Sequence, residues 1–293
     1  MPRLRSLRVR ARAKVNLDLR VLGRREDGYH ELRTIFQTLA LHDTLWFSRT
    51  SGPFAITATH PDVPVDHANI VWKAARALWR ARGSAGEPHG ISVRIVKRIP
   101  VEAGLGGGSS DAAAALVALN RLWDVKLGPP DLFDLASSLG SDVPFFLVGG
   151  AALGTGRGEV LYPLPDLPPM PVVLARPREG VSTAQAYAWY ASATRHTTRL
   201  QRLSVPWPPG SLNVRNDFEP VVFRHVPAAA RLRRALIDGG SELAMLSGSG
   251  SVVFGVFASE GDARRAAGLL PASTAGVWVT RFAGRRLRPR TGV

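Results

Sequence analysis

The sequence predicts a two-domain α+β protein, and two observations support this prediction. Runs typical of strands alternate with runs typical of helices in both halves of the chain. Between the halves, residues 162–171 hold five prolines in ten positions, which is typical of an exposed linker. We therefore expect an N-terminal domain over 1–162, a linker over 163–171 and a C-terminal domain over 172–293, with a cleft between the domains.

The clearest unit is a strand, a glycine-rich loop and a helix. Ile91 to Lys97 is a β-branched run typical of a strand. The loop Pro100-Val-Glu-Ala-Gly-Leu-Gly-Gly-Gly-Ser-Ser follows, and leucines at helical spacing then predict a helix over Asp111–Trp123, capped by Ser109 or Ser110. Glycines let the backbone approach a ligand, and a helix N-terminus offers unpaired N–H groups. The unit therefore predicts a polyphosphate site.

This loop differs from two common phosphate loops. No lysine follows Gly108, as a Walker A loop requires, and Ser109 stands where the dinucleotide fingerprint has glycine or alanine. A plain glycine turn that packs a strand on a helix remains the structural alternative. Two nearby carboxylates, Glu102 and Asp111, would repel phosphates unless they turn away or meet a metal ion.

The other elements follow from hydrophobic periodicity. Alternation over 7–13 and 13–22 predicts half-buried strands, and an Asp-Gly turn signal follows at 27–28. Helices are expected over 67–82, 129–140, 184–192 and 262–270, with a helical region starting at 216 and a polar loop at 206–210. Strands are expected over 172–175 and 276–282, and two more within 243–257 around a glycine turn.

Composition excludes several classes of protein. The 293 residues are 45% hydrophobic and 21% charged, which is ordinary for a globular protein. No cysteine is present, which excludes disulfides and zinc-thiolate sites. No apolar run reaches the roughly 20 residues of a membrane span, and the first residues lack a signal-peptide core. We therefore expect a cytoplasmic protein with no membrane partner.

The formal charge of +15 raises the question of nucleic acid. However, the 34 arginines and four lysines are spread along the chain rather than gathered in one block. The sequence therefore predicts no nucleic-acid partner, and the charge would steer an anionic small substrate instead. An RNA-binding module remains the alternative class, and it would need aromatic platforms within a basic stripe.

Several motifs, in chain order, resemble one superfamily. The glycine loop is similar to the phosphate-binding motif of the galactokinase, homoserine kinase, mevalonate kinase and phosphomevalonate kinase (GHMP) superfamily. Further motifs resemble the branch that phosphorylates a CDP-linked methylerythritol in the non-mevalonate isoprenoid pathway. They are Ala13-Lys-Val-Asn-Leu17, Gly28-Tyr-His30, Leu139-Gly-Ser-Asp-Val-Pro-Phe145, Asn216-Asp-Phe-Glu219 and Ser247-Gly-Ser-Gly250. The first two are the most specific, and the resemblance covers nearly the whole chain.

The resemblance implies a fold and a reaction. The fold would be that of a GHMP kinase, with a ribosomal protein S5 domain 2-like N-terminal domain and a ferredoxin-like C-terminal domain. The reaction would be ATP-dependent phosphorylation of the 2-hydroxyl of the CDP-alcohol, with Mg²⁺. Lys14 and Asp142 match the catalytic pair, in which the carboxylate orients the hydroxyl and the ammonium stabilises developing charge. Without the family resemblance, Lys14 would be interpreted as a solvated strand lysine and Asp142 as a turn carboxylate.

The resemblance also implies binding residues. ATP would contact Pro100, Val101, Glu102, Ala103, Gly104, Leu105, Gly106, Gly107, Gly108, Ser109 and Ser110, with Asn69 near the adenine. The substrate would contact Asn16, Tyr29, His30, Lys97, Tyr187, Gly248 and Ser249. Among these, His30 would read the cytosine edge and Tyr187 would stack on the ring, with Tyr29 and Trp189 as competitors. Ser110, at the end of the loop, is the expected Mg²⁺ ligand.

Some assignments stay open at this stage. Lys97 could be a solvated strand lysine, Asn69 a helix cap and Gly248 part of a plain tight turn. Arg12 departs from the family, which usually has proline there, and this could alter the entry of the strand. Another small alcohol, such as homoserine or mevalonate, is the alternative substrate. The protein is expected to be a monomer or a homodimer.

Overall fold

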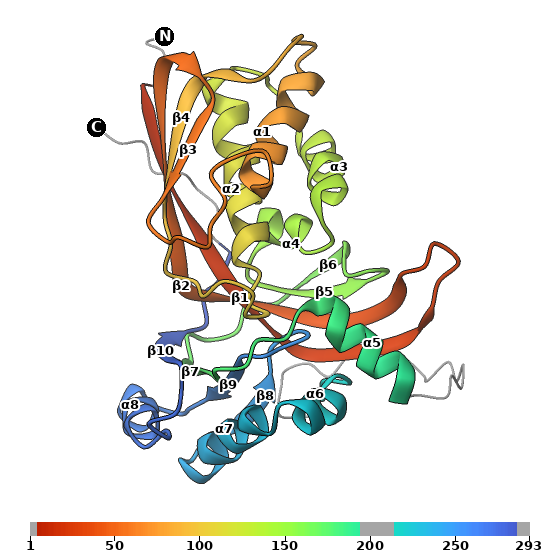
Figure 1. The fold of residues 1–293 in the computed structure, drawn as a ribbon, viewed down its shortest axis with the longest axis vertical. Coiled ribbons are helices and arrows are strands. Elements are labelled where there is room, and N and C mark those ends of the chain that lie inside the picture. Colours follow the sequence, from red (N-terminus) through yellow and green to blue (C-terminus); the bar gives the residue numbers. More distant parts are fainter. Residues whose placement is uncertain (1–4, 194–213, 286–293) are drawn as a thin grey trace.

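The computed structural model describes residues 5–193 and 214–285 and contains two β-sheets (Figure 1). The loop expected at 206–210 lies outside the described residues. The first sheet contains β1 (Ser6–Arg24), β2 (His30–Pro53), β3 (Ala55–Ala58), β4 (His89–Val96), β5 (Ala151–Thr155) and β6 (Val160–Leu164). The second contains β7 (Pro171–Arg176), β8 (Leu243–Leu246), β9 (Val253–Val256) and β10 (Gly276–Arg281).

The long strand β2 organises the first sheet. It pairs antiparallel with β1 along one side, and with β5 and then β4 along the other. Strand β3 joins β4 in parallel, and β6 joins β5. The sheet therefore has an upper half ordered β1-β2-β4-β3 and a lower half ordered β1-β2-β5-β6.

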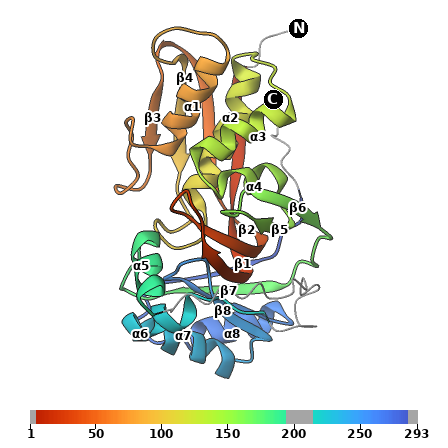
Figure 2. The same ribbon diagram turned by 90° about the vertical axis from the view of Figure 1, so that its right-hand side faces the viewer.

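Four helices cover one face of the upper half (Figures 1 and 2). They are α1 (Ile70–Ala81), α2 (Gly107–Leu122), α3 (Pro129–Leu139) and α4 (Val143–Val148). Helix α2 is buried on most of its surface, because its run of alanines lets it approach both the sheet and α1 closely. Leu45, Phe47 and Val93 form the floor of this core from the sheet.

The second sheet has the order β10-β7-β9-β8 and is antiparallel throughout. Helix α7 (Pro227–Asp238) packs on β8 and β9, and α8 (Glu260–Gly268) packs on β7 and β10. Helices α5 (Thr183–Ala193) and α6 (Glu219–His225) pack against each other near the β1–β2 hairpin (Figure 1). None of the helices in the described part of the chain is both long and apolar enough to cross a membrane.

The lower half of the first sheet packs on the second sheet. Ile35 and Leu39 of β2 share one buried cluster with Val172 of β7 and Phe254 of β9. Backbone hydrogen bonds add to the contact: the Leu19 N–H donates to the carbonyl of residue 215 at 2.8 Å, and the Ala283 N–H to that of residue 38 at 2.9 Å. These contacts set the β1–β2 hairpin beside α5, where the candidate site lies.

Most expected elements are present with ends shifted by a few residues, but the sequence analysis missed β2 entirely, and also the short elements β3, α4, β5 and β6. The reason is that polar side chains occupy buried positions of this strand. Thr34, Gln37 and Asp43 are almost fully buried, and each hides the apolar alternation by which a strand is identified. The two strands expected over 7–22 form one continuous strand, β1.

Candidate active site

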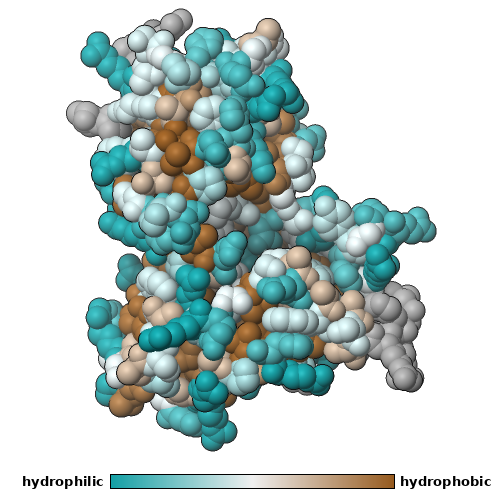
Figure 3. Space-filling view, viewed as in Figure 1, coloured by the Kyte–Doolittle hydropathy of each residue, from teal (hydrophilic) through white to brown (hydrophobic). Residues whose placement is uncertain are grey.

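A cavity of about 920 Å³ lies between the glycine loop, the β1–β2 hairpin, α5 and the residues that precede α4. Figure 3 shows the surface hollowed between the helical upper part and the arm formed by that hairpin. The predicted site residues that line it are Lys14, Asn16, Tyr29, His30, Asn69, Lys97, all of Pro100 to Ser109, Asp142, Tyr187, Gly248 and Ser249. Folding thus brings together residues separated by more than 230 positions. Ser110 is not part of the lining and is 2% exposed.

The glycine loop forms a tight cradle at the start of α2. Gly104 and Gly106 have φ of +72° and +69°, in the left-handed region where side chains are disfavoured. Gly106 is the N-cap, and no side chain caps the helix, so the expected cap by Ser109 or Ser110 is wrong. Both serines lie inside α2, which begins four residues earlier than predicted. The first N–H groups of α2 are therefore available to an anion in the cavity.

Lys14 and Asp142 meet at the base of this loop. The Lys14 Nζ donates to Asn16 Oδ1 at 2.7 Å and to the Gly104 carbonyl at 3.0 Å. It also lies 3.4 Å from Asp142 Oδ2, where the Lys14 side chain is 4% exposed and that of Asp142 34%. The ammonium is therefore fixed and buried, whereas the carboxylate faces the cavity and can reach a ligand.

The local backbone explains the orientation of Lys14. The pairing of β1 with β2 shifts register between Arg12 and Lys14 and again between Asn16 and Asp18. Such irregularities bend a strand and turn its side chains, and they are common near active sites. In addition, the Lys14 N–H donates to the Leu105 carbonyl at 3.0 Å. The strand is thereby attached directly to the glycine loop.

A second turn, Ser247–Gly250, supports the loop from the opposite side. Ser247 Oγ donates to the Gly104 carbonyl at 3.0 Å. The Asn216 side-chain amide donates to the carbonyls of Leu246 and Gly248 at 2.9 and 2.7 Å. Asn216 therefore has a structural role, because it holds this turn in place.

The aromatic end of the cavity contains the expected base-reading residues. The His30 and Tyr187 rings stack with centroids 4.8 Å apart. Tyr29 is 55% exposed, so its ring is accessible from the cavity. Burial raises the pKa of Tyr187, and the charge of Asp142 raises it further. The aromatic residues and Asp142 line the same cavity, so one ligand can contact both.

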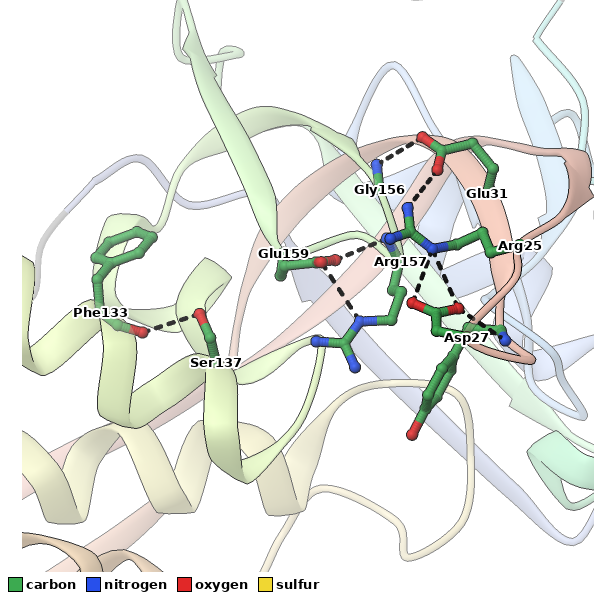
Figure 4. A network of polar contacts seen from close by, with 9 residues as sticks. Arg25, Asp27, Glu31, Phe133, Ser137, Gly156, Arg157 and Glu159 are labelled. Carbon is green, nitrogen blue, oxygen red and sulfur yellow. Dashed lines mark hydrogen bonds and ion pairs between the residues drawn. The ribbon is translucent and has the colours of Figure 1, made fainter.

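A polar network braces the hairpin that carries Tyr29 and His30 (Figure 4). The Glu31 carboxylate accepts from Arg25 Nη1 at 2.6 Å and from the Gly156 N–H at 3.1 Å. The Glu159 carboxylate accepts from the Arg157 backbone N–H at 2.7 Å and from the Arg157 Nε at 3.3 Å. The hairpin is thereby attached to the turn between β5 and β6.

Arg157 is a cavity residue that the sequence analysis missed. Its guanidinium carbon lies 4.8 Å from the centroid of the Tyr29 ring, and its side chain lines the cavity. In the sequence it is one of many arginines, within a glycine-broken turn that carries no catalytic motif. The pairing with Glu159 two positions later was the only local signal.

Lys97 lies beneath the glycine loop between two buried carboxylates. Its Nζ donates to Asp43 Oδ2 at 2.6 Å and to Asp111 Oδ2 at 2.9 Å. Asp43 in turn accepts from the N–H groups of Arg98 and Ile99 at the start of the loop. Burial raises the pKa of Asp111 to about 7, against the opposite effect of the Lys97 ammonium. The Lys97 ammonium is thus already paired with two carboxylates, and it connects the glycine loop to β2 through Asp43.

We expect Lys97→Met to destabilise the protein by about 3–5 kcal/mol, because it leaves two buried carboxylates without their cation. Urea unfolding measures this loss. Lys126→Met is the matched control, since the ion pair of Lys126 with Asp124 is highly exposed, and it should leave the unfolding midpoint nearly unchanged. An unaltered midpoint in Lys97→Met would contradict a structural role for this lysine.

Asn69 caps α1, as the alternative interpretation of this residue as a helix cap predicts. Its Oδ1 accepts from the Val71 N–H at 2.8 Å, and its side-chain amide donates to the Pro64 carbonyl. Asn69 also lines the cavity, so capping and ligand contact are compatible.

Within the described ranges, no cluster of three or more acidic, histidine or cysteine side chains forms a preassembled metal site. However, the carboxylates of Glu102, Asp111 and Asp142 all line the cavity around the glycine loop. Asp111 Oδ1 is buried and has no hydrogen-bond partner among the residues that the structure describes. Oxygen donors of this kind suit Mg²⁺, which usually binds one or two carboxylates together with substrate phosphates.

Comparisons with known proteins agree with this arrangement. A family model of the GHMP kinases N terminal domain matches residues 69–150, and one of the GHMP kinases C terminal matches residues 209–272. A 4-diphosphocytidyl-2-C-methyl-D-erythritol kinase of Solibacter usitatus is 47% identical, with 94% of this chain and 88% of the relative covered. The enzyme of the same name from Pelotomaculum thermopropionicum is 41% identical, with 94% and 98% covered.

Solved structures show the same relationship. A crystal structure of 4-(cytidine 5'-diphospho)-2C-methyl-D-erythritol kinase matches with a TM-score of 0.79 and 36% identity, covering 95% of this chain and 100% of that one. A homoserine kinase from Cytophaga hutchinsonii matches with a TM-score of 0.70 and 18% identity, covering 99% and 98%. The second match shows the fold alone. The α+β GHMP kinase fold expected from the sequence is therefore confirmed.

Proposed function

Because the chain belongs to the 4-diphosphocytidyl-2-C-methyl-D-erythritol kinase family of GHMP kinases, we propose that it phosphorylates the 2-hydroxyl of 4-diphosphocytidyl-2-C-methyl-D-erythritol with ATP. The reaction belongs to non-mevalonate isoprenoid synthesis. One observation carries the proposal for this chain: a single cavity holds the Lys14–Asp142 pair, the glycine loop and the aromatic group around His30.

Asp142 is the proposed base. Its partly exposed carboxylate orients the 2-hydroxyl and accepts its proton as the oxygen attacks the γ-phosphorus and the bond to ADP breaks. Lys14 stabilises the charge that develops on the attacking oxygen and the transferring phosphoryl group. Asn16 and the Gly104 carbonyl hold the ammonium in position, so little reorganisation is needed during the step.

The glycine loop, Pro100 to Ser110, is the proposed phosphate site. The N–H groups of the first turn of α2 point to the cavity end of the helix, where the helix dipole also favours negative charge. Asn69 borders the adenine end of the same cavity. Gly248 and Ser249 close the opposite wall, because their turn packs against Gly104.

The aromatic end is the proposed cytidine site. Tyr29 is the exposed ring on which cytosine stacks, and the His30–Tyr187 pair presents polar atoms to the base edge. The guanidinium of Arg157 covers the Tyr29 ring and supplies positive charge for the diphosphate of the substrate. We assign Lys97 to the support of the loop, as its two carboxylate partners favour.

Mg²⁺ is the cofactor that kinases of this kind require, and the oxygen-rich wall of the cavity fits it. Glu102 and Asp111 are the carboxylates beside the loop that would hold the ion together with phosphate oxygens. When bound, the ion neutralises phosphate charge. Ser110 remains the sequence-based expectation, although it does not line the cavity as Glu102 and Asp111 do. The cytoplasmic location, the domain boundaries and the monomer or homodimer remain predictions.

A substrate panel tests the function directly. With ATP, we expect turnover of the CDP-linked methylerythritol and none of mevalonate or homoserine, since only the first carries a base for Tyr29 and His30 to bind. CDP should inhibit competitively, and His30→Ala should raise KM for the CDP-alcohol far more than KM for ATP. Turnover of mevalonate or homoserine with no effect of CDP would favour the alternative of a kinase for another small alcohol.

A further inference from the structure

The upper half of the first sheet leaves one face without helices. Helices α1 to α4 cover one side, and none of the described helices lies on the opposite side, here called the outer face (Figure 1). Strand alternation places every second side chain of β1, β2, β4 and β3 on it. Its exposed and half-buried residues are Ser6, Arg8, Arg10, Trp46, Ser48, Ser92, Arg94, Ala55 and Thr57, whereas Thr44 beside Arg10 is buried.

Trp46 lies at the centre of the outer face. It is 42% exposed, and it is therefore one of the exposed large hydrophobic side chains in the described part of the chain. The strand register places Arg8 of β1 directly beside it on one side and Arg94 of β4 on the other. The guanidinium carbon of Arg8 is 5.0 Å from the ring centroid. The result is an aromatic ring with the Arg8 guanidinium over one of its faces and Arg94 beside it on the next strand.

The charge of the outer face is positive only. Arg8, Arg10 and Arg94 form no ion pair within the described residues, and none of the residues that make up the face is acidic. The row continues to the Arg12–His42 pair at the end of the upper half. Burial lowers the pKa of His42, and the charges of Arg10, Arg98 and Arg12 lower it further. Positive potential therefore extends along the face to this end.

We propose that the outer face binds single-stranded nucleic acid, with a base stacked on Trp46 and phosphates on Arg8, Arg94 and Arg10. Single strands are bound by this combination, because every base has a face that can stack and every nucleotide carries a negative charge. A purely anionic partner would use the arginines but would gain little from an exposed tryptophan between them.

The spacing of the cations suits a polynucleotide. Adjacent strands lie about 4.8 Å apart, which places the backbone positions of Arg8 and Arg94 about 10 Å apart across Trp46. Arg10 follows Arg8 on the same side of β1 at about 6.7 Å. Composition alone predicts no such partner, because these arginines come from separate parts of the chain. Only the pairing of β1, β2 and β4 gathers them around the tryptophan.

Fluorescence anisotropy with a labelled 12-nucleotide uridine RNA, and with a 12-nucleotide thymidine DNA, tests the proposal. ATP and CDP are present throughout, so that the cavity is occupied. We expect binding to the wild type at 50 mM salt and weakening by about tenfold in Trp46→Ala, from the loss of base stacking. In Arg8→Gln/Arg94→Gln, the slope of log affinity against log salt should fall by about 1.4, or 0.7 for each lost phosphate contact.

Arg231→Gln/Arg234→Gln is the matched control. It removes the same charge from exposed positions of α7, and it should leave RNA affinity near that of the wild type. Kinase turnover should be unchanged in all three variants, which shows that each is folded. The proposal would be overturned if the α7 control lost as much RNA affinity as the outer-face variants, or if Trp46→Ala bound RNA as tightly as the wild type. It would also be overturned if the protein bound phosphatidylserine vesicles but neither oligonucleotide. A higher affinity for one of the two oligonucleotides identifies RNA or DNA as the nucleic acid that the outer face binds.

Discussion

Replacing Asp142 by asparagine is expected to lower kcat by about 10²- to 10⁴-fold, which is the usual contribution of a positioned acid or base. The amide keeps the size of the side chain but cannot accept a proton. Lys14 keeps its hydrogen bonds to Asn16 and Gly104, so the site should remain assembled. Nucleotide affinity and Tm should therefore stay close to those of the wild type.

Steady-state kinetics, nucleotide titration and thermal unfolding measure the three quantities. Asp134→Asn on α3 is the control, because it makes the same chemical change at an exposed position outside the cavity, and it should keep full activity. An Asp142→Asn variant that retains most of its rate would show that another group acts as the base.

Replacing Gly104 by alanine should destabilise the protein by about 2–6 kcal/mol and abolish turnover. The left-handed backbone costs a residue with a side chain about 1–3 kcal/mol, and overpacking adds about 1–3 kcal/mol. A Cβ at this position would lie 2.2 Å from the Ser247 carbonyl oxygen, and backbone atoms cannot move away as a flexible side chain can. The loop and the supporting turn would therefore be forced apart.

Gly108→Ala provides the comparison within the same loop. Its φ is not positive, and the nearest neighbour of a Cβ there would be an Ile70 methyl group at 3.7 Å, an ordinary contact. We expect urea unfolding to show little change for this variant and a large loss for Gly104→Ala. Similar stability of the two would mean that the backbone at Gly104 can relax, and that the turn does not fix the loop.

Much of the site could be predicted from the sequence because its motifs are local. The strand, glycine loop and helix are contiguous, and Lys14 and Asp142 stand within short motifs that identify the family. Periodicity identified most of the helices and the strands of the second sheet. Spatial proximity could not be derived in this way: only the family resemblance linked residues 14 and 142 before the structure was known.

The remaining features depend on long-range pairing. β2 was missed because buried polar residues interrupt its alternation, and Asp43, which pairs with Lys97, lies on that strand. The role of Lys97 therefore could not be predicted, because its partner Asp43 lies on a strand that the sequence did not reveal. The same holds for Trp46, which becomes an exposed platform only through its neighbours on β1 and β4. Arg157 was one arginine among 34.

A crystal structure of the protein with a non-hydrolysable ATP analogue and the CDP-linked methylerythritol tests the central claim most directly. We predict the 2-hydroxyl of the substrate within about 2.6–3.2 Å of an Asp142 carboxylate oxygen, with the γ-phosphate beside Lys14 and above the glycine loop. A complex that places the hydroxyl out of reach of Asp142, or the phosphates away from residues 104–110, would contradict the proposed chemistry.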